Sequence, residues 1–163
     1  MNSRRLILAA ALVAAAAVAY AQQPAFPSYG PNITAEQARK AMAAAEAEAR
    51  GKGWPMAIAI VDTAGQLVMF QRFDNTQTGS IMVAQDKAVS AAMFRRPTKA
   101  FQDGVAGGGA GLRLIGLRNA SLLEGGLPIY IDGKIVGGIG VSGGSAEQDG
   151  VVAKGGTDAL GAR

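Results

Sequence analysis

Residues 125–144 read GGLPIYIDGKIVGGIGVSGG. Two apolar runs, Leu127–Ile131 and Ile135–Val141, flank the triplet Asp132-Gly133-Lys134. An Asp-Gly pair between apolar runs favours a tight hairpin, because the primed turns that join two strands need positive φ at their central residues. The stretch therefore predicts two antiparallel strands.

The second strand of this hairpin is poor in side chains. Gly137, Gly138 and Gly140 interrupt it, and glycine inside a strand or helix is less favourable than alanine by about 0.5–1 kcal/mol. Such a glycine usually marks a bend in the sheet, or a place where another backbone or a ligand comes close. The functional interpretation starts from this bare strand.

The rest of the chain predicts a second hairpin and several helices. An apolar run at 56–61, a turn at 62–66 and a strand at 67–73 form that hairpin. Thr34 and Gln37 form a capping box for a helix through residue 50, and Ser80 and Ser145 are expected to cap helices over 81–94 and 146–160. The glycine-dense residues 103–111 predict a loop. This order predicts an α+β fold, an antiparallel sheet flanked by helices on both faces.

The N-terminus has the pattern of a secretory signal. Arg4 and Arg5 precede an unbroken apolar stretch at 6–18, and Ala19-Tyr20-Ala21 is a small-x-small cleavage site. We therefore expect a signal peptide at 1–21, a proline-rich arm at 22–33 and a single domain at 34–163. The protein is expected to be exported, periplasmic or extracellular, with no transmembrane segment after signal cleavage.

Composition excludes several kinds of chemistry. The chain has no His and no Cys, which excludes Ser-His-Asp and Cys-His catalysis and the usual zinc sites. No metal site is predicted. Without Arg4 and Arg5 the net charge falls from +4 to +2 and no basic cluster is left, so no nucleic-acid partner is expected.

Three features could bind an anion or a cofactor. Gly138-x-Gly140-x-x-Gly143 matches a dinucleotide fingerprint, but the chain ends too soon for the second parallel strand that this site requires. The turn at 142–145 precedes a predicted helix and could hold a carboxylate or phosphate, or be a plain capped turn. Lys87 lies near the apolar stripe of its helix, where its amine either contacts an anion or, as spacing alone favours, reaches water.

Several motifs together resemble the GlcG/HbpS-like haem-binding, or haem-degrading, family. They cover about residues 34–160, and the combination of GGxPI, a DGK turn, GGIGVSGG and a following QD pair is specific. The contributing segments are Val61-Asp62-x-x-Gly65, Arg72-x-Asp74, Ser80, Lys87-Ala88, Phe94-x-x-Pro97-Thr98, Gly125-Gly126-x-Pro128-Ile129, Val136–Gly144 and Gln148-Asp149.

The resemblance implies a profilin-like architecture, a homo-oligomer and haem as the cofactor or ligand. It implies Thr98 at the porphyrin site, Lys87 and Arg72 as propionate contacts, and a close approach of the macrocycle or a neighbouring subunit along residues 137–144, at Gly138, Gly140 and Ser142. Because haem iron is usually held by His, Cys, Met or Tyr, the lack of His and Cys implies weak or transient binding.

Three functions remain open from the sequence. The first is an exported haem-binding protein that acts as a carrier, buffer or sensor partner, with a role in haem degradation left open. The second is an enzyme or binding module for a small anionic or corrinoid-type ligand. The third is a structural oligomer in which the glycine strand serves subunit contact alone.

Overall fold

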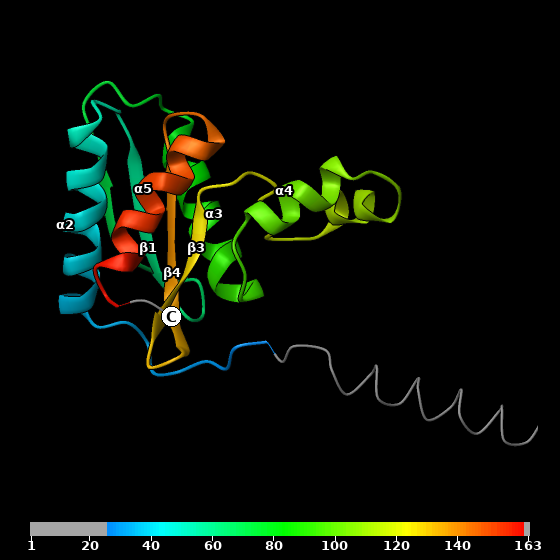
Figure 1. Ribbon diagram of the computed structural model, residues 1–163, viewed down its shortest axis with the longest axis horizontal. Coiled ribbons are helices and arrows are strands. Elements are labelled where there is room, and N and C mark those ends of the chain that lie inside the picture. Colours follow the sequence, from blue (N-terminus) through cyan, green and yellow to red (C-terminus); the bar gives the residue numbers. More distant parts are fainter. Residues whose placement is uncertain (1–25, 162–163) are drawn as a thin grey trace, which may run out of the picture.

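The computed structural model describes residues 26–161; the predicted signal peptide lies outside them. Four antiparallel strands form one sheet in the order β2-β1-β4-β3. Two helices cover one face of the sheet, a third covers the other, and a helical segment projects from the body (Figure 1). This confirms the predicted α+β fold. The elements are α2 (Ala35–Gly51), β1 (Ala57–Asp62), β2 (Leu67–Arg72), α3 (Ser80–Phe94), α4 (Lys99–Ala106), the 3-10 helix η1 (Gly109–Gly116), β3 (Gly126–Ile131), β4 (Lys134–Ser142) and α5 (Ala146–Asp158).

The two faces of the sheet differ in side-chain size. Toward α2 and α5, the paired residues of β1 and β4 are large, as in Ile60 opposite Ile139. Toward α3 they are small, as in Ala59 opposite Gly140. Because successive side chains in a strand point to opposite faces, this alternation lets α3 lie much closer to the sheet than α2 and α5 do.

Strand β4 lacks side chains on one face because α3 packs directly against it there. A β-carbon added at Gly140 would come within 2.1 Å of the Ala84 carbonyl oxygen, and one at Gly138 within 2.5 Å of the Ala88 carbonyl oxygen. Both glycines are buried. The expectation that another backbone comes close is confirmed, but that backbone is a helix of the same chain. The placement of a macrocycle or a neighbouring subunit on Gly138 and Gly140 is therefore wrong.

Local sequence signals set most element boundaries as predicted. Thr34 with Gln37 and Ser145 with Gln148 form complete capping boxes. Asp132 and Gly133 make the two-residue hairpin turn, with φ of 50° and 73°. The last helix ends at Asp158 rather than at about residue 160.

Two local predictions are wrong. Gly79, not Ser80, occupies the N-cap of α3, because the Ser80 hydroxyl is used by Gln77 and Ser142 instead. The predicted loop at 103–111 is largely helical, since α4 continues to Ala106 and η1 starts at Gly109. Packing between α4 and η1 outweighs the low helix propensity of the glycines. At Gly104, for example, an added β-carbon would lie 2.7 Å from the Leu114 side chain.

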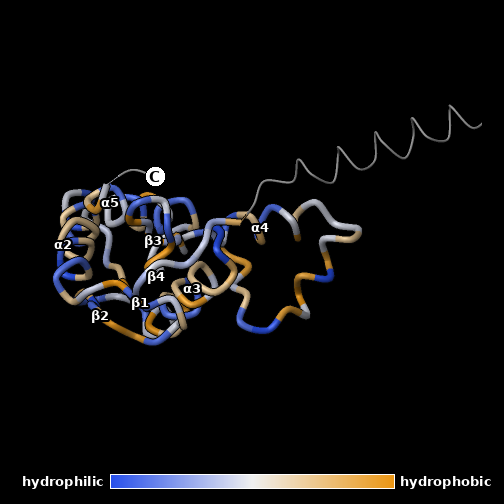
Figure 2. The backbone as a smooth tube through the Cα atoms, turned by 90° about the horizontal axis from the view of Figure 1, so that it is seen from below, coloured by the Kyte–Doolittle hydropathy of each residue, from blue (hydrophilic) through white to orange (hydrophobic). Residues whose placement is uncertain are grey.

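The α4–η1 projection, residues 99–117, extends away from the body of the domain (Figure 2). Phe101 at its base is 2% exposed, whereas Leu112 and Ile115 near its tip are 51% and 63% exposed. From its tip the chain returns along a strap, residues 118–125, to β3. No helix among residues 26–161 is long and apolar enough to cross a membrane.

The close approach of α3 to β4 predicts a large loss of stability for Gly140→Ala. The added methyl group meets helix backbone, which cannot rotate away, so we expect the free energy of unfolding to fall by about 1–3 kcal/mol or more. Urea denaturation followed by circular dichroism measures it. Gly51→Ala is the matched control, because a β-carbon there meets nothing within 4 Å. Equal stability of the two variants would contradict the packing argument.

Candidate functional site

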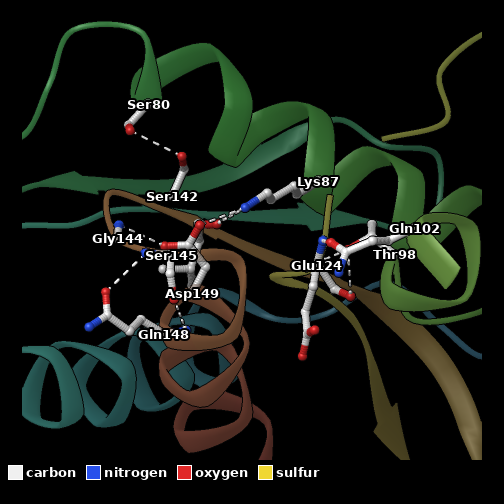
Figure 3. A network of polar contacts seen from close by, with 12 residues as sticks. Ser80, Lys87, Thr98, Gln102, Glu124, Ser142, Gly144, Ser145, Gln148 and Asp149 are labelled. Atoms are coloured by element: carbon white, nitrogen blue, oxygen red, sulfur yellow. Dashed lines mark hydrogen bonds and ion pairs between the residues drawn. The ribbon is translucent and has the colours of Figure 1, made fainter. Parts of the chain in front are cut away.

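A buried ion pair and an adjoining hydrogen bond join α3, β4 and α5. The Lys87 Nζ on α3 donates to the Asp149 Oδ2 on α5 at 2.7 Å and to the Val141 carbonyl oxygen on β4 at 3.0 Å (Figure 3). Lys87 is 1% exposed and Asp149 is 3% exposed. The expectation that the Lys87 amine reaches water is therefore wrong.

Asp149 also fixes the turn that precedes its own helix. Its Oδ1 accepts a hydrogen bond from the Gly144 amide at 3.0 Å. Burial raises the pKa of the Asp149 carboxyl above its ordinary value, while the hydrogen bond from Lys87 and the amides of Gly144 and Gly143 act in the opposite direction. In the sequence this residue was named only as part of the Gln148-Asp149 motif, and the structure gives it a buried partner.

Two buried hydroxyls lie beside the ion pair. The Ser142 Oγ at the end of β4 and the Ser80 Oγ at the start of α3 are 3.0 Å apart, and the Gln77 Nε2 also donates to Ser80 at 2.9 Å. Ser80 is 1% exposed and Ser142 is 5% exposed. Ser142 and Lys87 line one recess of about 270 Å³, which we call the Lys87 recess. Its lining residues are Gln77, Val83, Lys87, Leu123, Ser142, Gly144, Ala146 and Asp149.

The structure gives Thr98 a packing role. Thr98 is fully buried, and its Oγ1 accepts from the Gly126 amide at 2.9 Å while its own amide donates to the Gly126 carbonyl at 3.0 Å. The neighbouring Gln102 accepts from the Glu124 amide at 2.8 Å. These bonds attach the base of the projection to the start of β3 (Figure 3).

Arg72 lies apart from the other predicted site residues. It is exposed at the end of the edge strand β2, where it pairs with Ala57, and Ala57 pairs in turn with Ser142. A full strand therefore separates Arg72 from the Lys87 recess. Of the six predicted residues, the structure brings Lys87 and Ser142 to one recess, buries Thr98, Gly138 and Gly140 in packing, and leaves Arg72 outside.

A larger recess, which we call the strap recess, lies between the outer face of α3 and the strap. Its volume is about 490 Å³. Val89, Leu122 and Leu123 give it apolar walls, and Asp86 contributes a charge. It was not predictable from the sequence, because none of its lining residues belongs to a recognisable motif. The lining residues are Val83, Asp86, Val89, Asn119, Ala120, Ser121, Leu122 and Leu123.

The fold is thus a single antiparallel sheet with a close-packed helix, a buried lysine–aspartate pair and two adjoining recesses. The model of the family described as "Haem degrading protein HbpS-like" matches residues 33–158. The chain belongs to this family, and the resemblance seen in the sequence is confirmed.

Relatives and solved structures agree with this assignment. Protein GlcG of Escherichia coli K12 is 34% identical over 110 residues, which are 68% of this chain and 81% of GlcG. A structure of an HbpS double mutant from Streptomyces reticuli is 29% identical with a TM-score of 0.74, and the match covers 86% of this chain and 94% of that one. The structure of a PduOC:heme complex is 28% identical with a TM-score of 0.73, covering 80% and 96%.

The ion pair predicts strong coupling between Lys87 and Asp149. Lys87→Met leaves a buried carboxylate without its counterion, and Asp149→Asn leaves a buried ammonium, so each should lower the free energy of unfolding by about 3–5 kcal/mol. The double variant should lose clearly less than the sum, because neither charge remains. Urea unfolding of all four proteins in one double-mutant cycle measures this, and strictly additive losses would show that the two groups do not stabilise one another.

Proposed function

We propose that this protein binds haem reversibly, as a carrier, buffer or sensor partner. The observation that carries the proposal is the likeness to PduOC, a protein whose structure contains haem and whose fold is matched over 96% of its length. Membership of a family described by its haem chemistry supports the same reading.

The strap recess is the site that we propose for haem. It is the larger of the two recesses beside α3, and its walls include the side chains of Val89, Leu122 and Leu123. An apolar macrocycle gains free energy there by removing these side chains from water. The Lys87 recess, at about 270 Å³ and with a polar floor, is a poorer match for a porphyrin.

The lining fits the porphyrin ring better than it fits the iron. Haem iron is held in proteins by His, Cys, Met or Tyr. The strap recess has no residue of these four types in its lining. We therefore propose that binding rests on contacts with the macrocycle, and that affinity is modest. A carrier or buffer has to release its ligand, so modest affinity agrees with that role.

Self-association is part of the proposal. The tip of the α4–η1 projection exposes Leu112 and Ile115 by more than half, and the projection stands clear of the rest of the domain (Figure 2). A second copy that covered these side chains would also border the strap recess, because the strap leads directly from the projection to β3. Haem would then lie close to a subunit interface.

Export is likewise a proposal. It is supported by the basic pair at Arg4 and Arg5, the apolar stretch at 6–18 and the cleavage pattern at 19–21. An exported haem-binding protein would meet its ligand outside the cytoplasm.

Haem titration of the mature protein tests the main proposal. We expect a saturable shift of the Soret band, and Ala120→Trp should weaken binding by about tenfold or more because the indole occupies the strap recess; tenfold corresponds to about 1.4 kcal/mol. Ala43→Trp, on the exposed side of α2, is the matched control.

The outcomes separate function from location. No saturable shift in the unmodified protein would overturn haem binding itself. Equal affinity of the two tryptophan variants would leave haem binding intact but remove it from the strap recess. Loss of the Soret band in the presence of a reductant and oxygen would report haem degradation, which a carrier does not require.

The self-association proposal predicts that charge at the tip of the projection disperses the oligomer. Ile115→Arg should reduce the mass measured by light scattering toward that of one chain, because the guanidinium opposes burial of the surface. Val151→Arg, at a position 43% exposed on α5, should leave the mass unchanged. A single-chain mass for the unmodified protein would contradict self-association.

A further inference from the structure

Two buried groups at or beside the Lys87 recess have donor hydrogens without an acceptor among residues 26–161. Ser80 and Ser142 have two hydroxyl hydrogens between them, and the 3.0 Å bond that joins them uses one. The Gln77 amide donates to Ser80 and so takes up none. One hydroxyl hydrogen of this buried pair therefore has no acceptor among residues 26–161.

Lys87 adds a second spare donor. An ammonium group has three N–H bonds, and the Lys87 Nζ directs two of them to Asp149 and Val141. The third has no acceptor among the residues that the structure describes. Both oxygens of Asp149 are already engaged, Oδ2 by Lys87 and Oδ1 by the Gly144 amide.

The surroundings favour an acceptor that carries negative charge. Ala146 and Asp149 of the first turns of α5 line the recess, and Ser80, the first residue of α3, is hydrogen-bonded to the lining residues Ser142 and Gln77. The N-terminal ends of both helices are therefore close to it, and helix N-termini carry partial positive charge. The Lys87 and Asp149 charges balance one another, so the remaining field comes from the helix ends and the spare donors.

We propose that the Lys87 recess binds a small carboxylate, whose oxygen atoms accept the spare hydrogens of Lys87 and of the Ser80–Ser142 pair. The volume of about 270 Å³ equals that of roughly nine water molecules in the liquid, so the ligand is a compact acid and not a porphyrin. The site is therefore separate from the proposed haem site, and neither proposal depends on the other.

Sodium acetate is the probe for this site. Titration of the ¹⁵N-labelled protein should shift the amide resonances of Gly144 and Ser142 saturably. The double variant Ser80→Ala/Ser142→Ala should weaken acetate binding by about tenfold, because it removes the hydroxyl donor. Ser90→Ala is the matched control: Ser90 is also a fully buried serine on α3, and its hydroxyl has no partner among the described residues.

Acetamide tests whether charge matters, because it has the shape of acetate and keeps a carbonyl oxygen. We expect it to bind much more weakly than acetate. Equal binding of acetamide and acetate, shifts that do not saturate, or equal acetate affinity in the double variant and in Ser90→Ala would each overturn the proposal, since water alone then satisfies the spare donors. Circular dichroism confirms that the variants are folded.

Discussion

The contact between the backbone of α3 and the backbone of β4 determines how the rest of the molecule is arranged. Two glycines remove the side chains that would otherwise hold the helix away from the sheet, and the carbonyl oxygens of Ala84 and Ala88 occupy that space. Because the helix lies so near, the side chain of Lys87 can span from α3 past β4 to α5. The glycines that suggested a ligand-binding surface in the sequence therefore allow the charged side chain of Lys87 to lie within the core.

The ion pair in turn organises the turn between β4 and α5. Asp149 accepts from Lys87 with one oxygen and from the Gly144 amide with the other, so the start of α5 and its preceding turn are held against α3. A buried ion pair is often no more stabilising than an apolar replacement. Its effect on position is clear from the contacts, because it fixes Lys87 and Asp149 at the wall of a recess.

Local signals explain why most of the fold was predictable. The Thr34 and Ser145 caps and the Asp-Gly turn are properties of short segments, and each appears in the structure where the sequence placed it. The partners of Lys87 and Thr98 were not predictable in this way, since Asp149 and Gly126 lie 62 and 28 residues away.

One sequence signal for the burial of Asp149 was nevertheless present. Asp149 falls on the same helix stripe as the buried Val152, Ala153 and Gly156, where an acidic residue needs a partner. The strap recess had no such signal, because it arises only when the strap folds back against α3.

The two recesses share part of their walls, and this has a consequence for ligand binding. Val83 and Leu123 line both the strap recess and the Lys87 recess. A ligand that moved either side chain in one recess would change the shape of the other, so the two affinities would be linked. Such a linkage is reciprocal by thermodynamic necessity: if a small carboxylate altered haem affinity, haem would alter carboxylate affinity by the same factor. Leu123 is 52% exposed and lies on the strap. The strap is therefore the element through which the two sites would influence one another, while α3, held by backbone contact with β4, provides the fixed side of both.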